Sequence, residues 1–247
     1  MRVAALYDIH GNLPALEAVL EEIRREGVDR IVVGGDVLPG PMPLETLTRL
    51  LALDLPVQCI QGNGDRVVRE TMAGTDSTEV PAAFQESIRW NAQQVFAHQS
   101  VLASWPLTAR IAIDGLGDVL FCHATPRNDI EIFTRLTLEH RLVPIFEAAK
   151  APLVVCGHTH MQFDRTIGSI RVVNAGSVGM PFQEPGAYWL LLGPGVELRK
   201  TSYDLDAAAT RVRATAYPQA EPFAAASILQ PPSEQQMLEM FAHAELK

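Results

Sequence analysis

Short apolar runs alternate with amphipathic stretches through the first third of the chain. Arg2–Tyr7, Arg30–Val33 and Val57–Ile60 have the length and apolar character of buried strands. Leu13–Arg25 repeats apolar residues at the spacing of one helix face, and Leu44–Leu53 indicates a second helix. Because strands and helices alternate, the pattern predicts βαβ units in an α/β fold whose sheet is covered by helices.

The segment from Arg66 to Trp105 has a helical pattern. It contains four apolar residues suited to packing, which are Phe84, Ile88, Val95 and Leu102. Two roles are open for this segment: a cap-like insert over a cleft, or a plain layer that covers the sheet.

The second half of the chain is richer in antiparallel strands. Leu107–Ile113 and Asp118–Phe121 predict a β-hairpin, because a short Gly-containing loop joins them. One helix, one buried strand and two strand pairs are predicted after it: Leu138–Ala149, Leu153–Val155, Ile167–Val173 with a tight turn at Gly168–Ser169, and Tyr188–Leu192 with Val196–Lys200.

The pattern changes after Tyr203. Leu205–Ala216 is Ala-rich and helical, Pro218–Pro232 is rich in Pro and Ala, and Glu234–Leu246 is again helical. We therefore expect one domain over residues 1–203, with the insert at about 66–105, and a C-terminal helical tail over 204–247. An arm for homo-oligomers, a lid and simple surface cover are all open for the tail.

Composition narrows the function classes. The chain has 247 residues, 47% hydrophobic and 20% charged, which suits a packed globular protein. Its net charge of −9 disfavours duplex DNA or RNA as a partner. A small phosphate ester remains compatible, because a metal ion can reverse the local field in a cleft.

The chain also lacks an apolar run of the ~20 residues that a membrane helix needs, and its first apolar run is too short for a signal peptide. We expect a cytoplasmic protein with no membrane partner. Cys59, Cys122 and Cys156 lie in apolar runs without metal-type spacing and are expected to be buried free thiols.

Five polar motifs follow predicted strands. They are Asp8-Ile9-His10-Gly11-Asn12, Gly34-Gly35-Asp36, Gly62-Asn63-Gly64-Asp65, Cys122-His123-Ala124-Thr125-Pro126 and Gly157-His158-Thr159-His160. In an open sheet such loops converge outside the carboxyl ends of neighbouring strands. Two carboxylates, one amide oxygen and four imidazoles would then meet, a ligand set that suits divalent transition metals.

The order of these motifs resembles the calcineurin-like metallophosphoesterase superfamily, and within it the small prokaryotic phosphodiesterases. The resemblance implies a four-layer α/β/β/α sandwich with two mixed β-sheets. It also implies two divalent metal ions, with manganese the most frequent and iron, zinc, nickel and cobalt as alternatives. One ion would be held by Asp8, His10 and His160 and the other by Asn63, His123 and His158, with Asp36 bridging them.

The resemblance further implies a hydrolase in which a metal-bridging hydroxide attacks a small, nucleotide-like phosphodiester or phosphoanhydride. Asp36, Asn63 and His123 would be the catalytic residues of such a site. One alternative is a phosphomonoesterase resembling protein serine/threonine phosphatases. The alternative of another class is a non-catalytic scaffold of the same fold, as in a vacuolar sorting subunit, but this chain keeps competent ligands at all seven positions.

Three further positions deserve a prediction. Much of the superfamily has a histidine, thought to assist the leaving group, where this chain has Gly64. The sequence therefore predicts a preference for good leaving groups, and higher activity of Gly64→His on substrates with poor leaving groups. Without that histidine, Asp65 would only cap a helix. Alternatively, Gly64 opens the pocket for a bulkier substrate. Asn12 would either help to bind a phosphate or cap a helix, and Arg127 would either clamp phosphate oxygens or be a solvated arginine.

Overall fold

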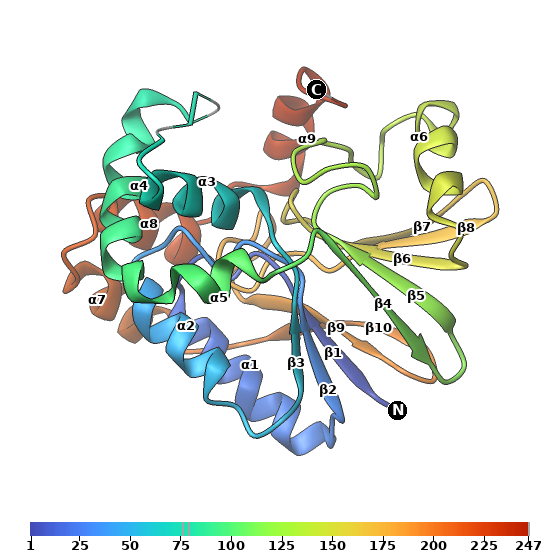
Figure 1. Cartoon of the computed structure of the whole chain (residues 1–247), viewed down its shortest axis with the longest axis horizontal. Helices are drawn as coiled ribbons and strands as arrows, with labels where there is room; N and C mark the ends of the chain where they lie inside the picture. Colours follow the sequence, from blue (N-terminus) through green and yellow to red (C-terminus); the bar gives the residue numbers. More distant parts are fainter. Residues whose placement is uncertain (76, 79, 247) are drawn as a thin grey trace.

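Two mixed sheets form the centre of the molecule in a computed structural model that describes residues 1–75, 77–78 and 80–246 (Figure 1). The first sheet has the order β10-β9-β1-β2-β3. Its strands β1, β2 and β3 are parallel, and β9 runs antiparallel to both β1 and β10. Their bounds are β1 Val3–Leu6, β2 Arg30–Val33, β3 Val57–Cys59, β9 Ala187–Leu192 and β10 Val196–Thr201.

The second sheet has the order β4-β5-β6-β8-β7. The predicted hairpin is confirmed, because β4 pairs antiparallel with β5. Strands β5, β6 and β8 are parallel, and β7 runs antiparallel to β8. The bounds are β4 Thr108–Ile113, β5 Gly117–Cys122, β6 Leu153–Cys156, β7 Phe163–Ile167 and β8 Ile170–Asn174.

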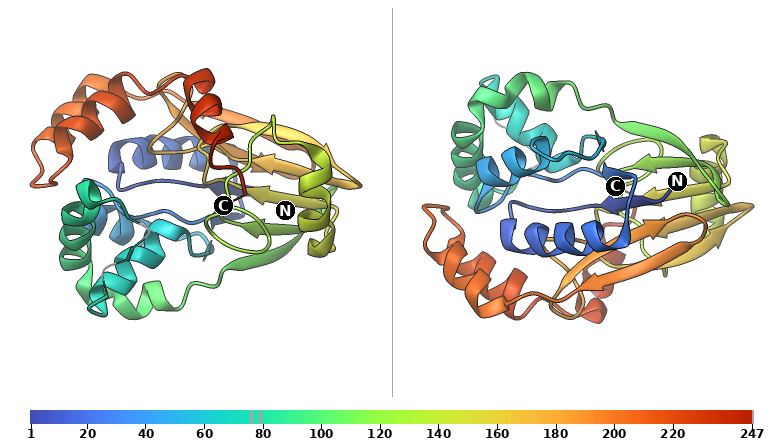
Figure 2. Two further views of the ribbon diagram at one scale, coloured as in Figure 1. Left: turned by 90° about the horizontal axis from the view of Figure 1, so that it is seen from above. Right: turned by 90° about the horizontal axis from the view of Figure 1, so that it is seen from below.

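Side chains of each central strand alternate between two cores. In β1, Ala4 and Leu6 face the helices, whereas Val3 and Ala5 face the second sheet. The outer face of the second sheet is covered by α6 (Glu139–Phe146) and the 3₁₀ turn η2 (Glu147–Ala149). Helices thus cover the outer faces of both sheets, and the predicted four-layer α/β/β/α sandwich is confirmed (Figure 2).

Most of the helical layer on the first sheet comes from residues 13–103. It contains α1 (Leu13–Glu26), α2 (Pro43–Leu51), α3 (Asn63–Met72), α4 (Ala82–Gln94), η1 (Phe96–His98) and α5 (Gln99–Ala103). Ile88, Val95 and Leu102 are buried there as predicted, so the segment does cover the sheet. The prediction for Phe84 is wrong, because its side chain is 51% exposed.

The tail joins the same layer. Ala209 and Val212 of α7 (Leu205–Arg213) and Ile228 of the π-helix η3 (Ala224–Leu229) are buried in the core of the first sheet. Helix α8 (Ala220–Phe223) lies in the Pro- and Ala-rich stretch, where no helix was predicted; Pro222 is accommodated because it stands in the first turn.

The last helix, α9 (Glu234–Ala242), lies apart from α7 and α8 and beside the loops at the carboxyl end of the strands (Figure 1). Its residues Met237, Leu238 and Phe241 pack against Met161 and Phe182. None of the described helices is both long enough and apolar enough to span a bilayer. Cys122 and Cys156 are buried free thiols, as predicted, but Cys59 is only half-buried.

Candidate metal centre

The five polar motifs meet where the parallel strands of both sheets end. Their backbone is unusual, since five of their residues have positive φ: Asp8 (53°), His10 (46°), Asp36 (51°), His158 (68°) and His160 (57°). The left-handed region destabilises a non-glycine residue by roughly 1–2 kcal/mol. Only two other non-glycine residues in the described part of the chain adopt it, so backbone strain is concentrated at this one place.

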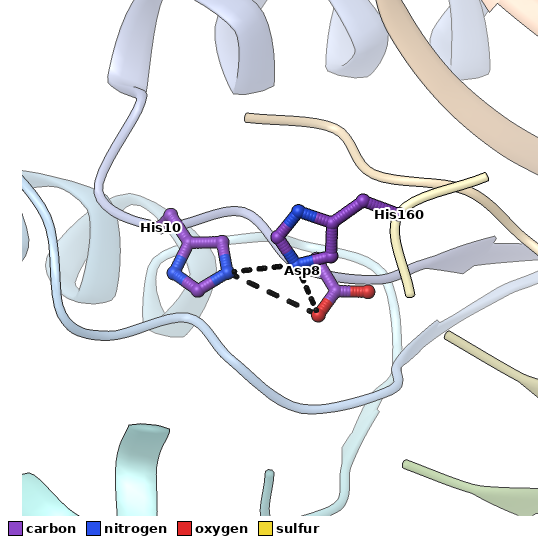
Figure 3. Close-up of side chains that lie close together, drawn as sticks. All are labelled: Asp8, His10 and His160. Carbon is purple, nitrogen blue, oxygen red and sulfur yellow. Dashed lines mark hydrogen bonds and ion pairs between the residues drawn. The ribbon is translucent and has the colours of Figure 1, made fainter. Parts of the chain in front are cut away.

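Asp8, His10 and His160 form the first group of side chains, with their polar atoms turned toward one another (Figure 3). Asp8 Oδ1 lies 3.3 Å from His160 Nε2 and 3.9 Å from His10 Nε2. The two imidazole Nε2 atoms are 3.2 Å apart. All three residues are buried.

Asp36 and His123 extend this group toward the second sheet. Asp36 Oδ2 lies 3.7 Å from His10 Nε2 and 3.6 Å from His123 Nε2, between the two rings. Asn63 Oδ1 is 3.0 Å from His123 Nε2, and the His158 ring packs on the His123 ring at 5.1 Å. The structure therefore brings all seven predicted ligands together.

Each of the four imidazoles has one ring nitrogen bound to a backbone carbonyl. The pairs are His10 Nδ1 with Pro39 (3.2 Å), His123 Nδ1 with Gly34 (2.9 Å), His160 Nδ1 with Met180 (2.7 Å) and His158 Nε2 with Ile130 (3.2 Å). A carbonyl can only accept a hydrogen bond, so the ring nitrogen beside it carries the proton, and in the neutral ring the other nitrogen carries a lone pair. The free nitrogens are Nε2 of His10, His123 and His160 and Nδ1 of His158.

Lone pairs and carboxylate oxygens therefore face one another without protons between them. Asp8 Oδ1 is fully buried and accepts no hydrogen bond, although His160 Nε2 is within 3.3 Å. A buried acceptor without a partner is unfavourable, and a cluster of such acceptors is the arrangement that a cation neutralises. The residues present thus fit divalent ions held by imidazole and carboxylate.

The pKa values follow from the same burial. Burial lowers the pKa of His10 to about 3, and the neighbouring His160 adds to the effect. Burial likewise lowers the pKa of His158 to about 3, so both rings are neutral near pH 7. Burial raises the pKa of Asp36, as does the charge of Asp8; burial opposes ionisation of Asp8 as well, but the surrounding histidines outweigh it and lower its pKa.

Asp65 has a larger role than the helix cap predicted for it. Its carboxylate caps α3 by accepting from the Gly62 amide at 3.1 Å, and it also accepts from the amides of Asp36 at 2.8 Å and Leu38 at 3.0 Å. It therefore ties the loop after β2 to the loop after β3. Burial raises its pKa to about 8, with a further contribution from the charge of Asp36.

A second supporting segment runs from Asn174 to Gly179. The Asn174 side chain donates to the Gly157 carbonyl at 2.7 Å, which holds the loop that carries His158 and His160. The Ser177 hydroxyl donates to the Asp8 carbonyl at 2.7 Å. The sequence gives no local signal for these roles, because the partners of Asn174 and Ser177 lie on other loops.

The structure excludes a side chain at Gly64. A Cβ atom there would lie 2.3 Å from the Leu38 carbonyl oxygen, 2.9 Å from Pro39 Cδ and 3.0 Å from Asp36 Oδ1. The expectation that Gly64→His improves activity is therefore wrong, since the backbone leaves no room for the ring. Close approach of the two loops explains this glycine.

The two predicted substrate contacts are engaged within the protein. Asn12 is buried; its Oδ1 caps α1 by accepting from Ala15 N at 3.2 Å, and its Nδ2 donates to the Gly179 carbonyl at 3.0 Å. The guanidinium of Arg127 is half exposed and pairs with Glu131. Asn12 thus makes the cap that was its alternative, and Arg127 is a paired rather than a free cation.

Comparison with known proteins identifies the family of this chain. The calcineurin-like phosphoesterase superfamily domain matches residues 1–192. An uncharacterized protein of Methanocaldococcus jannaschii, MJ0912, is 30% identical over 198 residues, which cover 72% of this chain and 76% of that protein.

Two solved structures share the fold. The hypothetical protein PH1004 from Pyrococcus horikoshii has a TM-score of 0.77 at 20% identity and covers 94% of this chain and 99% of its own. The metallophosphoesterase from Sphaerobacter thermophilus has a TM-score of 0.71 at 26% identity and covers 92% and 99%. With its five motifs gathered in one buried centre, this chain belongs to the calcineurin-like phosphoesterase superfamily, a family of metal-dependent phosphoesterases.

Proposed function

We propose that this protein hydrolyses small phosphodiesters or phosphoanhydrides with the help of two divalent metal ions. Asp8, His10 and His160 would hold one ion, and Asn63, His123 and His158 the other. Asp36 would contribute to both, since its Oδ2 atom lies between His10 and His123 at nearly equal distances. Manganese is the proposed native ion, with iron, zinc, nickel and cobalt as alternatives.

The observation that carries the proposal is the buried cluster of acceptors without donors. Asp8 Oδ1 and the Nε2 atoms of His10 and His160 lie within 3.9 Å of one another, and each Nδ1 is occupied by a carbonyl. Such a cluster is unfavourable without a cation and strongly favourable with one. Two bound ions would supply Lewis acidity toward phosphoryl oxygens and lower the pKa of a coordinated water.

The protein's own contribution is to hold this arrangement ready. The carbonyls fix the imidazole tautomers, and Asp65 holds the loop that presents Asp36. Preorganisation of this kind spares the site from rearranging its dipoles when charge develops on the substrate. The strained backbone at Asp8, Asp36 and His160 is consistent with selection for geometry over stability.

Gly64 supports the proposed substrate class. The position at which the superfamily resemblance leads one to expect a histidine has no side chain and no room for one. A leaving group of high pKa would therefore lack assistance from that position, which favours diesters and anhydrides with stable leaving groups over alkyl monoesters. Phosphomonoester hydrolysis is the second candidate; a non-catalytic scaffold is disfavoured because all seven ligand positions are competent.

The test is a substrate panel with manganese, comparing bis-(p-nitrophenyl) phosphate with p-nitrophenyl phosphate. We expect metal-dependent turnover with higher kcat/KM on the diester and two metal ions per chain by elemental analysis. His160→Gln should lose both, whereas His140→Gln, which changes an exposed histidine on α6, should lose neither. Preference for the monoester would favour the second candidate, and absence of metal-dependent turnover on any phosphate ester would refute the proposal.

A further inference from the structure

An ion pair joins the loop after β5 to the first turn of α3. Arg66 Nε donates to Asp129 Oδ2 at 2.8 Å, and Arg66 Nη2 donates to Asp129 Oδ1 at 3.4 Å. The two side chains are 18% and 10% exposed. A planar guanidinium that binds both oxygens of a carboxylate fixes direction as well as distance, so this pair constrains how the loop and the helix lie against each other.

Arg66 lies on the turn of α3 that presents a proposed metal ligand. It follows Asn63, the first residue of the helix, by three positions, so the two side chains share one face. Asn63 Oδ1 lies 3.0 Å from His123 Nε2. Together with His158, these two residues would hold one of the two ions, called the second ion below. A contact that holds Arg66 therefore also holds the turn from which Asn63 reaches the centre.

Asp129 lies in the loop that supports His158. It directly precedes Ile130, whose carbonyl accepts from His158 Nε2 at 3.2 Å and thereby leaves Nδ1 of that ring for the ion. The Ile130 side chain is 36% exposed and anchors the loop only weakly. The carboxylate of Asp129, bound by Arg66 of α3, supplies a stronger anchor one residue away.

Hydrogen bonds within the loop make it one compact unit. The Thr125 amide donates to the Asn128 carbonyl at 3.1 Å, and the Thr125 hydroxyl donates to Glu131 Oε2 at 2.6 Å. Asn128 Oδ1 in turn accepts from the amides of Ile130 at 3.1 Å and Glu131 at 2.8 Å. Because these bonds enclose Asp129, the Ile130 carbonyl follows the position of that residue.

Stability alone does not explain why this pair is buried. Removing two charges from water offsets most of the attraction between them, whereas loss of one partner leaves an unpaired charge. A buried ion pair is therefore a stronger constraint on geometry than a source of net stability. The pair also lies within electrostatic reach of the centre: burial and the charge of Asp8 raise the pKa of Asp36 most, and the charge of Asp129 adds to them.

We propose that Arg66 and Asp129 are positioning residues for the second ion. Their ion pair keeps Asn63 and the support of His158 at a fixed separation, so that ligands from two loops reach the same ion. The inference rests on the proposed two-metal function and adds two residues that are not ligands themselves. The first ion has no ligand on α3 and none supported by the Ile130 carbonyl, so it should depend little on the pair.

The experiment measures manganese binding at the two sites by calorimetry. The two affinities are assigned with His158→Gln and His160→Gln, each of which removes a ligand of one ion. Asp129→Asn keeps the shape of the side chain and should weaken the second ion about 10–100-fold and the first by less than about twofold. Arg66→Lys keeps the charge but not the two-point contact, and should show a smaller loss at the second ion.

Activity separates positioning from a direct role in the reaction. At saturating manganese, kcat and KM of both variants on bis-(p-nitrophenyl) phosphate should return to wild-type values. Asp118→Asn is the control, because it breaks an Asp–Arg ion pair, with Arg110, at the other end of β5. It should leave both manganese affinities unchanged.

Three outcomes would overturn the inference while leaving the proposed function intact. The first is equal weakening of both ions by Asp129→Asn, which would indicate a general disturbance. The second is a raised KM in Arg66→Lys at saturating manganese with unchanged metal affinity, which would make Arg66 a substrate contact. The third comes from Arg66→Met alone and combined with Asp129→Asn: if the losses multiply instead of matching the larger single loss, the two residues do not act as a pair.

A measurement on the metal-free protein keeps the inference separate from the proposed function. The Ile130 carbonyl holds the Nε2 proton of His158, so nuclear magnetic resonance should detect this proton in the wild type. Asp129→Asn should lose that signal through exchange with water, and the Nδ1 proton of His160, held by Met180, should stay visible. If the protein binds no ions and hydrolyses no phosphate ester, the proposed function fails; an unchanged His158 signal in Asp129→Asn would instead refute the positioning role.

Discussion

The backbone amide of Gly64 donates a 2.7 Å hydrogen bond to Oδ1 of Asp36. This bond leaves Oδ2 of the same carboxylate between the imidazoles of His10 and His123. It joins residues 28 positions apart and depends on the close approach of the loops after β2 and β3. The orientation of the central carboxylate is therefore set by a residue without a side chain.

Gly64→Ala should damage the centre. The new methyl group would meet the Leu38 carbonyl oxygen at 2.3 Å, and because that atom belongs to the backbone, a loop must move. Overpacking of this kind typically destabilises by about 1–3 kcal/mol. We expect a lower midpoint of thermal unfolding and weaker manganese binding, measured by circular dichroism and calorimetry.

Gly195→Ala is the matched control for that variant, since a Cβ at Gly195 meets no atom within 4 Å. It should unfold and bind manganese like the wild type. Wild-type manganese affinity in Gly64→Ala would mean that the two loops can separate without moving Asp36.

Asp65→Asn should weaken metal binding although Asp65 is not a ligand. Its carboxylate accepts from three backbone amides, and an amide in its place would turn an NH₂ group toward some of them. Loss of a hydrogen bond that orients a metal ligand typically lowers metal affinity about 10–100-fold. Asp204→Asn is the control, because Asp204 caps α7 through Ala207 N and has no contact with the centre. Equal manganese affinity in both variants would show that Asp65 acts only as a cap.

The sequence was most informative about the buried strands and about the polar motifs that follow them. Strands β1 and β6 are continuous apolar runs and β2 is apolar after Arg30, and the ligand motifs follow these strands directly, so both could be predicted. Phe84 was misread because periodicity defines a helix face but not whether another element covers it. The links from Asp65 to the amides of Asp36 and Leu38 span 29 and 27 residues, and no local pattern encodes them.

Chelation should abolish activity and leave the fold intact. The three large apolar cores lie between and outside the sheets and contain none of the metal ligands. The far-ultraviolet circular dichroism spectrum should therefore be unchanged after treatment with a chelator, and manganese should restore turnover. Small metal domains behave differently, because their folding depends on the ion. Loss of secondary structure on chelation would assign the ions a structural role.

Phe182→Ala should weaken the ion held by His160. The Phe182 ring stacks on the His160 ring at 4.6 Å and contacts Phe241 of α9 at 6.1 Å. Removing it leaves the Met180 carbonyl as the remaining support of the His160 ring, so we expect about tenfold weaker binding of one manganese ion and little change for the other. Met240→Ala serves as control, since Met240 is on α9 but 61% exposed. Equal weakening of both ions would indicate a general disturbance of the fold.

Asp36→Asn gives the sharpest test of the shared carboxylate. The asparagine keeps an oxygen that can accept from the Gly64 amide, while its NH₂ group can donate toward the free nitrogens of His10 and His123. The metal-free variant should thus unfold at the same temperature as the metal-free wild type or higher, because burial and the charge of Asp8 disfavour an ionised carboxylate at this position and the amide is neutral. Metal binding should nevertheless weaken for both ions, by at least about 100-fold, and turnover should fall below detection. A variant that keeps two ions and wild-type kcat would exclude Asp36 as the shared ligand; loss of one ion alone would assign it to a single site.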